Sequence, residues 1–281
     1  MYGNGRGFSE AAERVASGGI GCRLVCRIIG IALCITPLFD LNAAELTQTV
    51  AAVKPAVVGI ATQHKTRSPA VVFFGTGFAV GNGLTVLTNA HVVAPQADVE
   101  KSGVLGILIS GSNGTAEFRP ATLVAIDKEH DLALLKIAGT PLPALKLGDS
   151  DEVREGQSLA FTGFPLGMVL GLHHATHRAT VAAITPIVQP AMSAQRLDAK
   201  AITQLQQSAY EVFQLDGTAY PGNSGSPVYD PATGTVYGII NMVFIKGLKE
   251  SAITAPSGIS YAIPSNYLRK LLQKQIQAVA P

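Results

Sequence analysis

Three short segments of the chain carry the residue types that nucleophilic catalysis requires. They hold, in this order, His91, Asp131 and Ser224, the last within Gly222–Pro227. A serine hydroxyl is a weak nucleophile at neutral pH unless an imidazole accepts its proton and a carboxylate orients that imidazole. The three groups are far apart in the chain, so a fold must bring them together. We predict Ser224 as nucleophile, His91 as general base and Asp131 as the orienting carboxylate.

Each of these residues has a competing interpretation. His64 is an alternative base, but nothing around it indicates a catalytic context. Asp127 is the nearest alternative acid and lies in a more polar stretch, whereas Asp131 opens an apolar run, where a partly buried carboxylate needs a partner. The Gly-Asn-Ser-Gly loop at 222–225 can also be a turn without a chemical role. The three motifs together favour catalysis.

The elements that must position these groups are short β-strands. Runs of β-branched residues alternate with Gly, Pro and Asn turns, a pattern typical of a sandwich or barrel. A Pro-rich connection at 139–143 marks the boundary between two halves. We also predict an amphipathic helix at 193–208 and a last helix at 265–277. The predicted strands are 57–61, 71–80, 84–88, 104–109, 118–126, 132–137, 158–163, 177–184, 210–215, 227–229, 235–244 and 259–263.

Composition excludes several classes of function. The chain has 281 residues, 47% of them hydrophobic, and a formal net charge of +2, which indicates a globular protein without a nucleic-acid partner. No phosphate loop or dinucleotide fingerprint is present, so we expect no cofactor. His173, His174 and His177 form a small cluster, but a zinc site would need further donors and no cysteine lies nearby. We expect no metal.

The N-terminus resembles a targeting segment. Residues 1–27 are basic and Gly-rich, residues 28–39 are apolar, and Asn42–Ala44 offers a small-residue cleavage site. We predict a signal peptide at 1–44, with an uncleaved membrane anchor at 28–41 as the alternative. The three cysteines all lie in this segment, so the remaining chain has no disulfide. Export without disulfides indicates a bacterial periplasmic or secreted protein.

From about Val53 to Leu272 the chain resembles the protease domain of the HtrA/DegP type, within the trypsin-like (chymotrypsin-fold) serine peptidases. Besides the three motifs, this resemblance includes Gly75–Phe78, Leu145–Ser150, Gly163–Gly167, Gln214–Asp216 and Tyr261–Pro264. It implies an all-β fold of two antiparallel six-stranded β-barrels with a C-terminal helix. Residues 45–281 would form this domain, with a first barrel at about 47–138, a second at about 153–264 and the helix at 265–277.

The resemblance also assigns the substrate-binding groups. The oxyanion hole would lie in Gly222, Asn223 and Ser224, with the N–H groups of Gly222 and Ser224 as donors. Thr218 falls at the base of the specificity pocket and Val243 near its wall, which implies a small apolar residue before the scissile bond. The segment Asn241–Val243, which includes Met242, would pair with an extended substrate.

Three features depart from the family pattern. The chain stops at Pro281, so we expect no PDZ domain within it. Ser226 stands where a second glycine is usual, and we expect little disturbance from this small residue. Pro186–Tyr210 is longer than the usual loop. A separate contrast is with zymogen-type trypsins, which have an aspartate before the serine. Asn223 cannot pair with a new N-terminal amine as that aspartate would, so we expect no activation by N-terminal cleavage.

The function implied is an exported serine endopeptidase that acts on unfolded or exposed polypeptides. The alternative is a proteolytically silent chaperone-like or binding protein on the same fold, and an esterase is a third possibility. Residues 45–53 lack the aromatic residues through which family members trimerise, so a trimer is not supported and the oligomeric state is left open.

Overall fold

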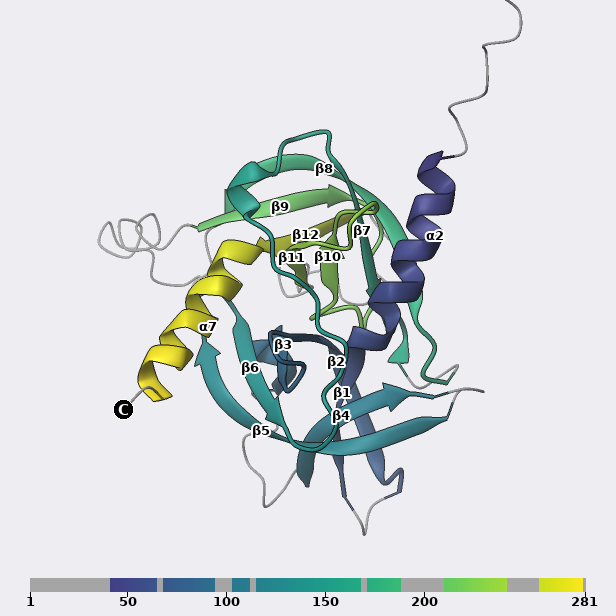
Figure 1. The fold of residues 1–281 in the computed structure, drawn as a ribbon, viewed down its shortest axis with the longest axis vertical. Coiled ribbons are helices and arrows are strands. Elements are labelled where there is room, and N and C mark those ends of the chain that lie inside the picture. The colour runs from purple at the N-terminus through teal and green to yellow at the C-terminus, as the bar shows by residue number, and fades with distance from the viewer. Residues whose placement is uncertain are drawn as a thin grey trace, which may run out of the picture. The chain divides into compact units, whose positions relative to one another are not determined.

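Two closed barrels of six antiparallel strands each form the body of the described chain (Figure 1). The computed structural model describes residues 41–64, 68–93, 103–111, 115–167, 171–187, 210–241 and 258–279. This arrangement confirms the predicted all-β double-barrel fold.

The first barrel has the strand order β1-β2-β3-β6-β5-β4, and β4 closes it by pairing with β1. Its strands are β1 (Val57–Gln63), β2 (Val71–Val80), β3 (Thr85–Asn89), β4 (Val104–Ser110), β5 (Ala116–Asp127) and β6 (Leu132–Ile137). Between β3 and β4 lies the short helix α3 (Ala90–Val93), which follows β3 directly.

The second barrel repeats this plan with the order β10-β11-β12-β9-β8-β7, and β7 closes it against β10. Its strands are β7 (Ser158–Gly163), β8 (Ala175–Ile187), β9 (Tyr210–Asp216), β10 (Pro227–Tyr229), β11 (Val236–Asn241) and β12 (Ile259–Pro264). The predicted helix at 193–208 lies outside the described residues.

The connection between the barrels lies along both of them. Leu145 forms a parallel bridge with Val80 at the end of β2, and Leu147 forms one with Val236 at the start of β11. A 3-10 turn, η4 (Ser150–Glu152), follows. One cluster of buried side chains contains Phe78 and Leu132 of the first barrel together with many from the second. Because the barrels share this apolar core, groups from both can be held in fixed register.

Helices flank the barrels at both ends of the described chain. α7 (Ser265–Val279) continues directly from β12 and packs against β5, β6 and β11, so it contacts both barrels (Figure 1). α2 (Leu41–Val53) leads through the 3-10 turn η1 (Lys54–Ala56) into β1. No helix among the described residues is long and apolar enough to cross a membrane.

Helix α2 is the element that sequence analysis missed. Val53 is buried, and Thr49 Oγ1 donates a hydrogen bond to the carbonyl of Ala232 at 3.0 Å, so the helix packs on the turn between β10 and β11. The predicted cleavage site at 42–44 falls in its first turn. The boundary between residues 44 and 45 stays a prediction.

Candidate active site

The acid of the predicted triad lies at the end of the turn that joins β5 to β6. Asp131 has a φ of 52°, a left-handed conformation that is uncommon for a residue with a side chain. Its carbonyl accepts hydrogen bonds from Ala90 N at 3.0 Å and Asn89 Nδ2 at 3.1 Å. The backbone of Asp131 is thereby fixed to the junction of β3 and α3.

The histidine lies on α3 and contacts this carboxylate twice. The His91 N–H donates to Asp131 Oδ1 at 2.8 Å, and His91 Nδ1 lies 2.5 Å from Asp131 Oδ2. The side chains are 25% and 14% exposed. A carboxylate only accepts hydrogen bonds, so this contact assigns the proton to Nδ1 and leaves Nε2 as the basic nitrogen. That tautomer is the one a general base needs.

A third group holds the same carboxylate from the second barrel. Asn241, the last residue of β11, donates from Nδ2 to Asp131 Oδ2 at 2.8 Å. Sequence analysis assigned Asn241 to substrate pairing and did not foresee this side-chain contact. An asparagine that ends an otherwise apolar, buried strand was the available signal, because a buried amide needs a partner.

The predicted nucleophile lies in a tight turn before β10. Ser224 is 6% exposed, and its carbonyl accepts a hydrogen bond from Thr76 N at 2.8 Å. Gly225 has a φ of 90°, and a Cβ there would lie 1.8 Å from the carbonyl oxygen of Thr76. Only glycine fits this position. Within the described part of the chain, no hydrogen bond joins Ser224 Oγ to His91, a contact that often tightens only when substrate binds.

Two backbone amides beside the serine are available to a ligand. Among the described residues, neither Gly222 N nor Ser224 N donates a hydrogen bond, whereas Asn223 N donates to Tyr220 O at 2.9 Å. These are the two donors that the sequence analysis predicted for the oxyanion hole, and two free N–H groups are what a tetrahedral oxyanion requires. Their role in catalysis stays a prediction.

Neighbouring contacts fix the direction of these amides. Leu166 N donates to Pro221 O at 2.7 Å, and Thr76 Oγ1 donates to Gly222 O at 2.7 Å. In a planar trans peptide the N–H points opposite to the carbonyl, so anchoring Pro221 O aims the N–H of Gly222 away from Leu166. Leu166 has a φ of 59°, the other left-handed residue besides Asp131 that is not glycine in the described chain.

Comparison with known proteins identifies the family. Residues 75–239, more than half of the chain, match the model of the trypsin-like peptidase domain. The chain belongs to the trypsin-like peptidase family. It is 32% identical to a probable periplasmic serine endoprotease DegP-like of Halomonas elongata over 68% of this chain and 32% of that protein. It is also 32% identical to the mitochondrial serine protease HTRA2 of Bos taurus, over 71% of this chain and 36% of that protein. The chain thus spans about a third of the length of these curated relatives.

Solved structures with the same fold include HtrA-type proteases. The HtrA-type protease AlgW with a decapeptide superposes with a TM-score of 0.60 at 23% identity, covering 83% of this chain and 67% of that one. The active form of the Rv3671c protease from M. tuberculosis gives a TM-score of 0.58 at 21% identity, covering 83% and 86%. The trypsin-like, HtrA/DegP-type resemblance read from the motifs is confirmed.

The specificity residues predicted for this trypsin-like chain are only partly described. Thr218 is half-buried in the segment after β9, next to Ala219, whose N–H donates to Ser260 Oγ at 2.8 Å. Met242 and Val243 lie outside the described residues. A preference for small apolar residues therefore stays a prediction.

His173, His174 and His177, which lie between β7 and β8 or on β8, have separate environments. His174 Nε2 lies 2.9 Å from the carbonyl of Val57, and His177 stacks on Phe161 with ring centroids 4.9 Å apart. Among the described residues, the three histidines form no group with metal-ligand spacing. Burial lowers the pKa of both imidazoles, and for His174 it outweighs the opposing effect of the bond to Val57.

These two lowered pKa values predict an acid-sensitive fold. The unfolded histidines bind protons near their ordinary value of 6.5, whereas the folded ones bind them only at lower pH. Between these values the unfolded state holds more protons, so the free energy of unfolding falls as the pH drops through 6.5. Urea unfolding from pH 8 to pH 5 should show this decline, and His177→Phe should flatten it. His64→Asn is the control, because His64 is not among the groups that shift the pKa of His174 or His177. Equal slopes in all three proteins would contradict the assignment.

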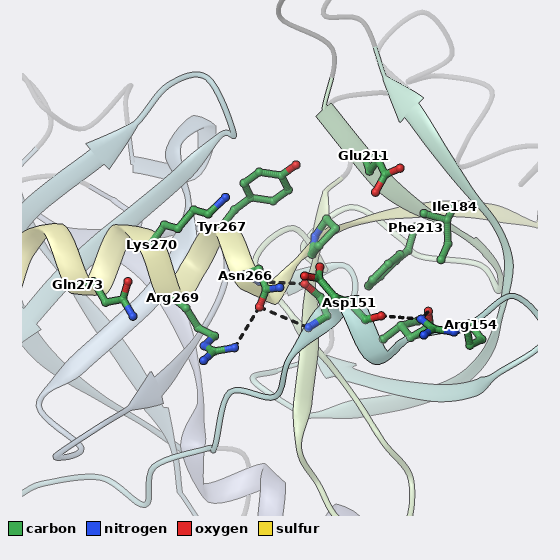
Figure 2. A pocket seen from close by; sticks show the side chains of 13 residues that line it. Asp151, Arg154, Ile184, Glu211, Phe213, Asn266, Tyr267, Arg269, Lys270 and Gln273 are labelled. Carbon is green, nitrogen blue, oxygen red and sulfur yellow. Dashed lines mark hydrogen bonds between the residues drawn. The ribbon is translucent and has the colours of Figure 1, made fainter.

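Figure 2 shows a separate pocket of about 590 Å³. Its walls come from η4, β8, β9 and the first turns of α7. Phe213 and Ile184 provide apolar surface, and Arg154, Glu211 and Lys270 provide charges of both signs. None of the predicted catalytic residues His91, Asp131 and Ser224 lines it.

Proposed function

We propose that the protein is a serine endopeptidase that uses Ser224, His91 and Asp131. The observation that carries this proposal is the pair of contacts between His91 and Asp131, which leaves Nε2 of His91 as the base. The free N–H groups of Gly222 and Ser224 support it, as does the similarity to proteins named serine endoproteases.

The groups act in the following order. His91 Nε2 removes the proton of Ser224 Oγ as that oxygen attacks the peptide carbonyl, and the N–H groups of Gly222 and Ser224 bind the oxyanion. His91 then donates the proton to the leaving amine, which breaks the C–N bond and leaves an acyl-enzyme. A water molecule, deprotonated by His91, attacks the ester. His91 then returns that proton to Ser224 Oγ as the C–Oγ bond breaks, which releases the acid and restores the free serine. Asp131 stays ionised and stabilises the imidazolium throughout.

The substrates we propose are unfolded or exposed segments cut after small apolar residues. Thr218 carries no charge, so a pocket with Thr218 at its base does not favour lysine or arginine. Val243 would narrow the pocket wall, and Asn241–Val243 would hydrogen-bond to the extended substrate. The DegP-like relatives are named periplasmic, which supports export of this chain to the periplasm through residues 1–44. Retention by an uncleaved segment at 28–41 is the alternative.

Digestion of an unfolded polypeptide tests this specificity. Reduced and carboxymethylated lactalbumin, incubated with the purified protein, should yield fragments that end predominantly in Val, Ala or Ile when analysed by mass spectrometry. The same reaction with the Ser224→Ala variant controls for contaminating proteases. Cuts mainly after Lys, Arg or large aromatic residues would contradict the pocket assignment. Binding of the polypeptide without any cut would favour the chaperone-like alternative.

A further inference from the structure

The turn that precedes Asp131 contains a second histidine–aspartate pair. The Asp127 carboxylate accepts hydrogen bonds from the backbone N–H groups of Glu129 and His130, each at 3.1 Å, and its Oδ2 lies 2.7 Å from His130 Nδ1. Burial raises the pKa of Asp127, but the bonds from His130 outweigh it and the pKa is lowered. The ionised Asp127 carboxylate thus organises the whole turn. Asp127 was the alternative to Asp131 as the triad acid, and the structure gives it this separate role.

The ring of His130 is held against the second barrel and the C-terminal helix. It stacks on Tyr267 of α7 with centroids 4.1 Å apart at 24°, and meets Tyr210 of β9 edge-on at 4.9 Å. The two tyrosines contact each other at 5.6 Å. Tyr267 extends toward Glu211 of β9 in Figure 2.

His130 is the residue immediately before Asp131. Asp131 must keep its left-handed backbone while its carboxylate reaches His91 in the first barrel and Asn241 in the second. A movement of this turn relative to the second barrel would break the contact with Asn241 or with His91. The ring cluster ties the turn to that same barrel.

We propose that His130, fixed by Asp127 and packed on Tyr210 and Tyr267, is a positioning residue for the triad carboxylate. It touches no substrate and acts only through Asp131. This proposal rests on the endopeptidase function proposed above. Because a misplacement of about 1 Å can cost about 100-fold in rate, loss of His130 should lower the chemical rate rather than substrate affinity.

Steady-state hydrolysis of a fluorogenic peptide by four variants of the full chain tests the proposal. His130→Ala and Asp127→Ala are expected to lower kcat roughly 10- to 100-fold with KM within about twofold of the wild type. His130→Phe keeps the ring contacts and should recover part of this loss. Asp149→Ala is the matched control, because Asp149 also accepts two turn-fixing hydrogen bonds, from Asp151 N and Asn266 Nδ2, on a turn that does not carry Asp131.

The outcomes separate positioning from stability. Melting temperatures are measured for every variant, and rates are taken well below them. Wild-type kcat in a folded His130→Ala protein would overturn the proposal. An equal loss of kcat in Asp149→Ala would also overturn it, because a generic loss of stability would then explain both. An inactive wild type would instead refute the endopeptidase function itself.

Discussion

Replacing Ser224 by alanine is expected to lower kcat for peptide hydrolysis by about 10⁶-fold, to the level that binding and the oxyanion donors provide alone. The reason is that the substitution removes the Oγ that attacks the peptide carbonyl in the proposed mechanism. The fold should be unchanged, because the Ser224 contact to Thr76 uses the backbone carbonyl. Active-site titration and hydrolysis of a fluorogenic peptide measure the loss.

Ser226 provides the matched control for this substitution. It lies in the same turn and is fully buried, and its Oγ has no hydrogen-bond partner in the described structure. Removing an unpartnered hydroxyl costs little, so Ser226→Ala should retain activity close to that of the wild type. If the Ser226 variant lost as much activity as the Ser224 variant, the nucleophile assignment would be wrong.

Replacing Asp131 by asparagine is expected to lower kcat by about 10⁴-fold, an effect known for this substitution in related triads. Both carboxylate oxygens accept hydrogen bonds: Oδ1 from the His91 amide, and Oδ2 from His91 Nδ1 and from Asn241. An asparagine has only one oxygen, so its NH₂ group must face one of these donors. If it faces His91 Nδ1, the imidazole turns to the wrong tautomer and Nε2 is no longer basic.

The pH profile distinguishes this loss from a loss of folding. The Asp131→Asn protein should recover activity at alkaline pH, where other bases can deprotonate the serine, while its melting temperature stays near that of the wild type. Asp216→Asn, at the exposed end of β9, is the control carboxylate and should leave kcat within about twofold. Activity above a tenth of wild type at neutral pH in Asp131→Asn would exclude Asp131 as the orienting acid.

Much of the fold could be predicted because strands and turns leave local signals. The runs that become β2, β6 and β7 have the predicted bounds, since each is apolar and ends at turn residues. α2 gave a weaker signal, because Leu41–Val53 lacks a strong apolar stripe.

The contacts that join distant parts of the chain at the candidate site could not be predicted from the sequence. His91 and Asp131 were recognised from their motifs, but the left-handed backbone of Asp131 depends on the Asp127 turn and on contacts with Ala90. The bond from Asn241 to Asp131 joins residues 110 positions apart in different barrels. Secondary-structure propensity and hydrophobic periodicity cannot predict such a contact, because it forms only after the two barrels have packed together.

Labelling with a fluorophosphonate probe tests the central claim most directly. The probe phosphonylates a serine only where a base activates it and an oxyanion hole receives the developing charge. We expect the wild-type chain to be labelled, with the adduct on Ser224 by mass spectrometry, and the Ser224→Ala variant to remain unlabelled. A folded wild type that is not labelled, or a Ser224→Ala variant labelled equally well, would contradict the proposed catalytic site.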